Sequence, residues 1–160
     1  ITRPEWRRMV PGVRALCRRA ARSALAASGR LPGTACELAI VLSDDATLRR
    51  LNQAFRDQDM ATNVLAFPAL DAVRPVGAPM QMGDVVLALE TILAEAQSQA
   101  KTPAAHVAHM VVHGVLHLLG FDHGTAREAR RMEAAEIGVL AGLAIADPYR
   151  ESAPSAPMRP

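Results

Sequence analysis

The spacing of apolar residues along the chain predicts five helices. Apolar side chains recur at intervals of three and four residues, the period of a helix that buries one face. The segments with this period are residues 12–28, 44–55, 91–100, 103–119 and 125–143. Thr102 before Pro103 is a typical helix start, and Thr125 with Glu128 has the spacing of a capping box. Gly120 is placed to end the fourth helix.

Three shorter segments have the apolar character of strands. They cover residues 36–43, 62–68 and 83–90, and Pro68 would end the second one. Residues 69–82 lie between strands, contain two prolines and a glycine, and are predicted to form an exposed loop.

This order of elements predicts an α+β fold. We expect a single small domain with a mixed sheet of three to four strands surrounded by about five helices. Residues 1–146 are expected to form this domain. The Pro-, Ala- and Ser-rich residues 147–160 are expected to form a flexible tail.

The composition narrows the class of protein. The chain has 160 residues, half of them hydrophobic, which is enough for one core. It has no apolar run of about 20 residues that could span a membrane, and its arginine-rich start does not resemble a signal peptide. Cys17 and Cys36 are too few for a disulfide framework and are expected to be buried, reduced thiols. We therefore predict a cytoplasmic protein that does not associate with membranes.

The positive charge is concentrated near the N-terminus. The net charge is only +2, but residues 1–30 hold eight arginines and one acidic residue, Glu5, for a local charge of +7. Arg14, Arg18 and Arg22 lie on the predicted helix 12–28 and could bind RNA phosphates. The blander interpretation is that they form the solvated face of an amphipathic helix.

All five histidines fall within residues 106–123. His113 and His117 are four residues apart, so their rings project from one face of the predicted helix. Gly120 allows a left-handed turn that would bring His123 back towards this pair. Three neutral imidazoles leave one position of a tetrahedral zinc ion free, as in catalytic zinc sites. The sequence therefore predicts one divalent metal ion, zinc, at the end of a central helix.

The residue after His113 restricts the chemistry that the site could perform. The same histidine spacing occurs in metzincin proteases, which carry a glutamate where this chain has Gly114. Peptide hydrolysis needs a group that protonates the amine leaving group. RNA carries its own nucleophile, the 2′-hydroxyl, and needs mainly proton removal and stabilisation of charge on the phosphate. Gly114 thus argues against a peptidase and leaves phosphodiester cleavage open.

Three more polar residues lie near the three predicted metal ligands in the sequence. His106 and His109 are on the same predicted helical face, where they could line the site or be half-buried polar residues. Asp122 could accept a hydrogen bond from a ligand N–H or support the turn, and a role as a base ranks last.

Several segments resemble the motifs of the YbeY family of bacterial endoribonucleases. They are HGVLHLLGFDH (113–123), LNQAFRDQDMATNVLAFP (51–68), GDVVLALE (83–90) and GVLAGLAIADPY (138–149), and the resemblance covers about residues 36–149. It implies a mixed four-stranded sheet and one metal ion on His113, His117 and His123. It also implies a single-strand-specific endoribonuclease that acts in 16S rRNA 3′-end maturation and ribosome quality control. The implied partners are rRNA and the small ribosomal subunit, with no role for DNA.

The resemblance also implies roles for individual residues. It places the functional arginine at Arg56, so Arg56 and His113 are the expected catalytic residues. Asn63 is expected near the metal or in the substrate groove, at a position where many family members have aspartate. Ala66 replaces the usual serine. The strand expected before the first helix is barely present, which leaves the strand count at three to four.

Two other functions stay open at this point. One is a non-catalytic ribosome assembly factor in which the metal ion is structural. The other is a metal-dependent amidohydrolase or peptidase, against which Gly114 argues. The arginine-rich helix suits an endoribonuclease and an assembly factor equally well.

Overall fold

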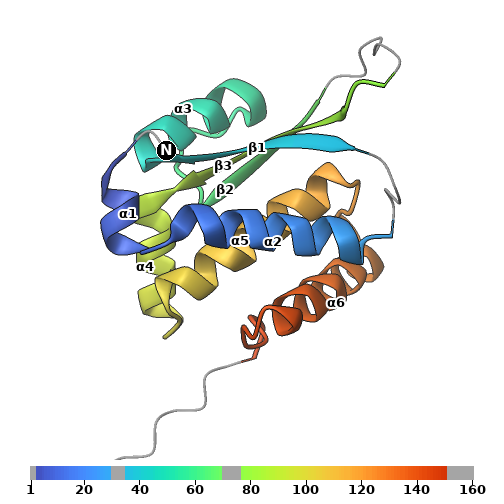
Figure 1. The fold of residues 1–160 in the computed structure, drawn as a ribbon. Coiled ribbons are helices and arrows are strands. Elements are labelled where there is room, and N and C mark those ends of the chain that lie inside the picture. Colours follow the sequence, from blue (N-terminus) through green and yellow to red (C-terminus); the bar gives the residue numbers. More distant parts are fainter. Residues whose placement is uncertain (1–2, 30–34, 70–76, 151–160) are drawn as a thin grey trace, which may run out of the picture.

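The computed structural model describes residues 3–29, 35–69 and 77–150 (Figure 1). These ranges contain six helices and three strands. In chain order they are α1 (Glu5–Met9), α2 (Val13–Ala27), β1 (Cys36–Ser43), α3 (Asp45–Arg56), β2 (Val64–Pro68), β3 (Met80–Ala88), α4 (Leu89–Ser98), α5 (Pro103–Leu118) and α6 (Ala126–Gly142). The predicted α+β fold with a small mixed sheet is confirmed. A fourth strand does not occur among the described residues.

The sheet has the order β1-β3-β2, with β3 in the centre. β1 runs parallel to β3, and β2 runs antiparallel to it. Val85 of β3 pairs with Ile40 on one side and with Ala66 on the other. Because side chains alternate along a strand, each strand of this sheet supplies apolar residues to both faces.

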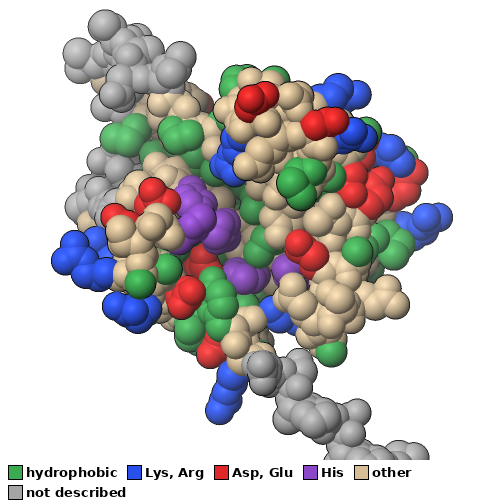
Figure 2. Space-filling view, turned by 180° about the vertical axis from the view of Figure 1, so that it is seen from behind, with side chains coloured by type: hydrophobic (Ala, Val, Ile, Leu, Met, Phe, Trp, Pro, Cys, Tyr) green, Lys and Arg blue, Asp and Glu red, His purple; other side chains and the backbone are tan. Residues whose placement is uncertain are grey.

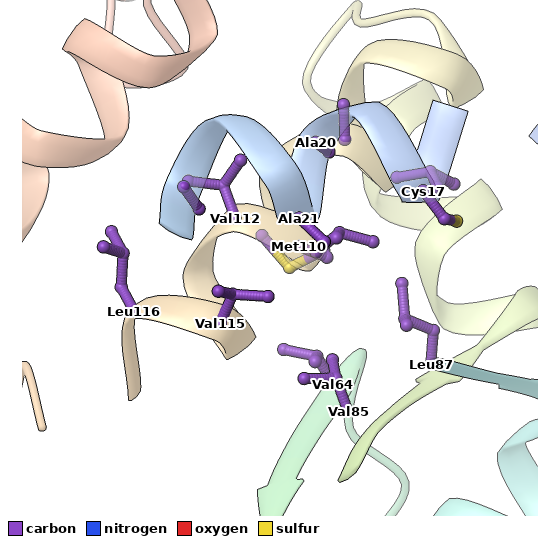
Figure 3. Close-up of a cluster of buried hydrophobic side chains, with 14 of the residues drawn as sticks. Cys17, Ala20, Ala21, Val64, Val85, Leu87, Met110, Val112, Val115 and Leu116 are labelled. Atoms are coloured by element: carbon purple, nitrogen blue, oxygen red, sulfur yellow. The ribbon is translucent and has the colours of Figure 1, made fainter. Parts of the chain in front are cut away.

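Helices cover both faces of the sheet (Figure 1). On one face, Leu48 of α3 packs in a small cluster with Leu65, Val86 and Ala88. On the other face, α2, α5 and α6 build the main core over Val85 and its neighbours on the strands. Figure 3 shows part of this core, with side chains of α2, α5 and the sheet directed towards one another.

Helix α5 packs against β2 and β3 of the sheet and against α2, α4 and α6. Eleven of its sixteen residues are buried. It begins as predicted, with Thr102 as the capping residue: the Thr102 hydroxyl accepts a hydrogen bond from the N–H of Ala105 (3.1 Å). A helix that is buried on nearly all sides provides a rigid support for the histidines that it carries.

The structure corrects several element boundaries. The short helix α1 has no periodic pattern and was not predicted. It is anchored by Trp6, whose ring N–H donates to the carbonyl oxygen of Ser43 (2.8 Å). β3 begins at Met80, within the predicted loop 69–82, because parallel pairing with β1 extends it. β3 ends at Ala88, so α4 begins two residues earlier than predicted. Residues 70–76 of the predicted loop lie outside the described residues.

The contacts of the domain continue past the predicted boundary at residue 146. The carbonyl oxygen of Pro148 accepts a hydrogen bond from Lys101 (2.6 Å), and the Tyr149 hydroxyl donates to Glu136. Residues 151–160 of the predicted tail lie outside the described residues. Within the described part of the chain, no helix is long and apolar enough to cross a membrane.

The two cysteines are free thiols. Cys17 is buried, and this burial raises the pKa of its thiol to about 11. Cys36 is only half-buried, which corrects the expectation that both thiols are buried.

Candidate functional site

The C-terminal end of α5 brings three histidines together. Gly120 has a φ of 77°, the left-handed conformation predicted for it. Its N–H donates to the carbonyl oxygen of His117 (2.9 Å), and the N–H of Phe121 donates to that of Leu116 (3.0 Å). This pair of bonds is the Schellman motif, which reverses the chain direction at a helix end. As a result His113, His117 and His123 each offer one ring nitrogen within 4.8 Å of the others.

Hydrogen bonds orient the two helical rings of this cluster. His113 Nδ1 lies 2.8 Å from a carboxylate oxygen of Glu136, and His117 Nδ1 lies 3.1 Å from the carbonyl oxygen of Phe121. Both partners are acceptors only, so both Nδ1 atoms are donors. In the neutral rings the free lone pairs are therefore on the Nε2 atoms. These Nε2 atoms face each other at 3.1 Å.

This arrangement fits a divalent metal ion. Two lone pairs that face each other at 3.1 Å repel unless a cation or a proton lies between them. Burial, followed by the neighbouring rings of His113 and His123, lowers the pKa of His117. The neutral imidazole is the form that binds metals. The predicted triad can therefore hold a metal ion, and the lowered pKa of His117 favours the neutral form that binding requires.

A buried carboxylate lies behind the cluster. Glu136 of α6 is 0% exposed, and it accepts hydrogen bonds from His109 Nε2 (2.9 Å), His113 Nδ1 and the Tyr149 hydroxyl. Burial alone would raise the pKa of Glu136, but these three bonds outweigh burial and lower it to about 2. Sequence reasoning did not find Glu136. The sequence gives one indication of it: Glu136 follows Met132 by four residues, which places an acidic side chain on the apolar face of the last helix.

A second carboxylate connects another histidine to Asn63. His106 Nε2 lies 2.7 Å from Glu95, and the Asn63 side-chain amide donates to both carboxylate oxygens of Glu95 (2.9 and 3.1 Å). Burial lowers the pKa of His106, an effect that Glu95 opposes. His106 is thus a buried, hydrogen-bonded residue. This fits the interpretation of His106 as a polar residue of the interior that does not line the site. Glu95 was not identified from the sequence.

The three histidines line a groove of about 580 Å³. Figure 2 shows histidine side chains gathered on one face of the molecule. Arg56, Asn63, Ala66 and Asp122 line the same groove, so most of the predicted site residues are brought together. Arg56 is the last residue of α3, one residue beyond the predicted end of this helix. Among the described residues, its guanidinium has no hydrogen-bond or ion-pair partner.

Two expected site residues have other surroundings. His109 is buried behind the groove, and hydrogen bonds through Glu136 connect it to His113. The Asp122 carboxylate accepts a hydrogen bond from the backbone N–H of His123 (2.7 Å), so it supports the turn. This contact agrees with the turn role considered for Asp122.

Gly114 faces the sheet at close range. A Cβ atom at this position would lie 2.6 Å from Cγ1 of Val85, far inside van der Waals contact. The glutamate that proteases carry here could not be accommodated without displacing β3 or Val85. The close packing of α5 on β3 thus gives a structural reason for this glycine.

Comparison with known proteins identifies the family. A family model described as Endoribonuclease YbeY matches residues 9–144. The chain belongs to the YbeY family. The match begins well before residue 36, so it includes α2, which lies outside the sequence motifs that resemble the family.

Curated YbeY proteins cover most of the chain. Endoribonuclease YbeY of Paramagnetospirillum magneticum is 52% identical over an alignment of 151 residues that covers 92% of each chain. Endoribonuclease YbeY of Rhodospirillum rubrum is 48% identical over an alignment of 155 residues that covers 92% of this chain and 78% of the relative. The solution structure of TM1509 from Thermotoga maritima covers 94% of this chain with a TM-score of 0.55 and 20% identity, a likeness of fold.

The arginines of α2 lie apart from the histidine groove of this YbeY protein. Arg14, Arg18 and Arg22 line a second groove of about 940 Å³ between α2 and the sheet. The two grooves share Pro68 at the end of β2. The structure therefore does not bring the arginine face and the three histidines into one cavity.

Proposed function

We propose that this protein is a metal-dependent endoribonuclease that cleaves single-stranded RNA. The observation that carries the proposal is the groove itself, in which three convergent histidines and Arg56 lie together. Membership of the YbeY family supports RNA as the substrate class.

We propose a zinc ion bound by Nε2 of His113, Nε2 of His117 and one ring nitrogen of His123. Three neutral imidazoles suit zinc, and the expected metal–nitrogen distances are about 2.0–2.1 Å. When bound in such a site, zinc acts as a Lewis acid and activates water at neutral pH. The hydrogen bonds to the Nδ1 atoms keep the His113 and His117 rings oriented for this role.

Arg56 is the proposed partner for the scissile phosphate. Negative charge grows on the non-bridging oxygens during phosphodiester cleavage, and a guanidinium can bind two of these oxygens at once. The free guanidinium of Arg56 lines the groove and is available for this contact. Asn63 lines the same groove, with its side-chain amide held by Glu95, and would contact the RNA chain.

The arginine face of α2 would bind RNA phosphates outside the cleavage site. Arg14, Arg18 and Arg22 are exposed and line the second groove. Their separation from the histidines suits a role in affinity rather than in the chemical step.

The family likeness supports rRNA as the biological substrate. We propose that the enzyme acts in the cytoplasm on rRNA of the small ribosomal subunit, in 16S rRNA 3′-end maturation and ribosome quality control. A peptidase is disfavoured because Gly114 leaves no space for the usual glutamate. An assembly factor without activity is the remaining alternative.

Labelled rRNA fragments distinguish these functions. Zinc-loaded protein should cleave single-stranded fragments, leave duplex fragments intact, and lose activity after zinc removal or the change His117→Ala. Arg50→Ala is a control, because Arg50 is exposed on α3 and lies outside the groove. Binding of the fragments without cleavage by the zinc-loaded protein would instead favour the assembly factor.

A further inference from the structure

We propose that Glu136 is a positioning residue of the metal site, which holds His113 in the tautomer that offers Nε2 to the metal ion. This inference rests on the proposed metal-dependent function. It assigns a role to a buried side chain of α6 that does not line the groove.

The geometry around Glu136 permits one proton arrangement. An ionised carboxylate only accepts hydrogen bonds, so each of its three partners must donate. One oxygen accepts from His113 Nδ1 (2.8 Å), and the other accepts from His109 Nε2 (2.9 Å) and from Tyr149. The proton of neutral His113 is therefore on Nδ1, and its lone pair is on Nε2, the atom that faces His117.

His109 and Tyr149 fix the carboxylate from the side away from the metal site. His109 is one turn before His113 on α5, and Tyr149 follows α6. Their bonds to one oxygen of Glu136 leave the other oxygen directed at His113. With its side chain fully buried, Glu136 has little freedom to rotate away from the ring.

His113 is the helical ligand that depends on another side chain. His117 has an equivalent Nδ1 bond, but its acceptor is the backbone carbonyl of Phe121 (3.1 Å). That acceptor is part of the turn and keeps its place whatever side chain residue 121 carries. Loss of the Glu136 carboxylate would therefore free one ligand ring while the other stays oriented.

A simpler role for Glu136 would be to stabilise the packing of α6 on α5. Loss of such a contact would lower the stability of the metal-free protein, but the contact would not select a tautomer of His113. The two roles therefore differ in two measurements, zinc affinity and the position of the His113 proton.

The experiment compares Glu136→Gln with Glu133→Gln. Glutamine keeps the size of the side chain, but its NH₂ group cannot accept from His113 or His109. Glu133 is on the same helix and makes no hydrogen bond to any of the five histidines, so its change controls for the loss of one negative charge. Zinc affinity is measured by competition with a chelator, without RNA.

We expect Glu136→Gln to weaken zinc binding by about 10–100-fold, the usual effect of losing such a partner of a metal ligand. Glu133→Gln should bind zinc like the original protein. Nitrogen NMR of the metal-free proteins, with neutral rings, should show the His113 proton on Nδ1 in the original protein. In Glu136→Gln it should show a mixture of tautomers.

Unchanged zinc affinity in folded Glu136→Gln, or an unchanged His113 tautomer, would overturn the positioning role. If Glu136→Gln does not fold, Glu136→Asp takes its place, since it keeps the charge but is one methylene shorter. It should bind zinc more weakly than the original protein, and equal affinity would also overturn the role. Neither readout involves cleavage, so the two proposals can fail separately. If Glu136→Gln changes zinc affinity and the His113 tautomer as expected, but the original protein does not cut RNA, only the proposed function is refuted.

Discussion

Gly114 of α5 lies so close to Val85 of β3 that any side chain at position 114 would collide with it. A Cβ atom added to Gly114 would be 2.6 Å from one methyl carbon of Val85 and 3.1 Å from the other. Both residues are buried, so neither can move into solvent. The contact sets the depth at which the helix that bears the metal ligands rests on the sheet.

Gly114→Ala should therefore destabilise the protein, although alanine favours helices. Overpacking of this kind typically costs about 1–3 kcal/mol, which denaturant unfolding can measure. Gly138→Ala on α6 is the matched control. Its added Cβ would meet nothing within 4 Å, so it should stabilise by about 0.5–1 kcal/mol.

A double-mutant cycle tests the cause of this destabilisation. In a Val85→Ala background the colliding methyl groups are absent, so the cost of Gly114→Ala should shrink. An equal cost in both backgrounds would mean that another contact is responsible.

The metal-free protein should lose stability as the pH falls below about 6.5. Burial lowers the pKa of His106 from its ordinary value of 6.5, so the unfolded chain takes up this proton at a higher pH than the folded protein. The stability that neutral His106 contributes is thus present above pH 6.5 and is lost as the pH falls through the lowered value. Denaturant unfolding of the metal-free protein at several pH values measures the slope of the unfolding free energy against pH. The change His106→Gln should reduce this slope. An unchanged slope would show that other groups control the acid response.

Features of this structure that depend on residues close together in the sequence could be predicted. Helix starts were correct at Thr102 and Thr125, where side chains cap the backbone within three residues. The triad was also accessible from the sequence, since a helical spacing and the conformation of Gly120 determine it. Helix α1 has no such signal, because it is held by a distant contact of Trp6.

The residues that sequence reasoning missed act through contacts between separate elements. Glu136 lies 23 residues from His113, and only the packing of α6 on α5 brings the two together. Glu95 reaches Asn63 and His106 in the same way, from α4. No periodicity or motif spacing in one chain encodes such pairs. For the same reason, the separation of the α2 arginines from the histidine groove could not be foreseen.

Neutralising the arginine face of α2 should flatten the salt dependence of RNA binding. Each lost phosphate contact lowers the slope of log K against log salt by about 0.7 for single-stranded RNA. The triple change of Arg14, Arg18 and Arg22 to Gln should lower it by up to about 2 if all three contact phosphates. Arg19→Gln is the single-site control, as Arg19 is exposed on α2 but does not line the second groove. If the triple variant keeps the original slope, this face only aids solubility.

Arg56→Ala should abolish most RNA cleavage while zinc affinity and stability stay unchanged. The guanidinium lies in the groove of the three histidines, and no described residue pairs with it, so its loss leaves no protein group unsatisfied. Removing one electrostatic donor to a developing negative charge typically lowers the rate by about 10²–10³. Arg56→Lys should recover little of this rate, because an ammonium cannot bind two phosphate oxygens in the planar geometry of a guanidinium. Arg50→Ala is the matched control, since Arg50 is exposed on the same helix but lies outside the groove. Single-turnover cleavage of a single-stranded fragment separates the chemical step from binding. A wild-type rate in zinc-loaded Arg56→Ala would show that phosphate stabilisation in this groove comes from another group.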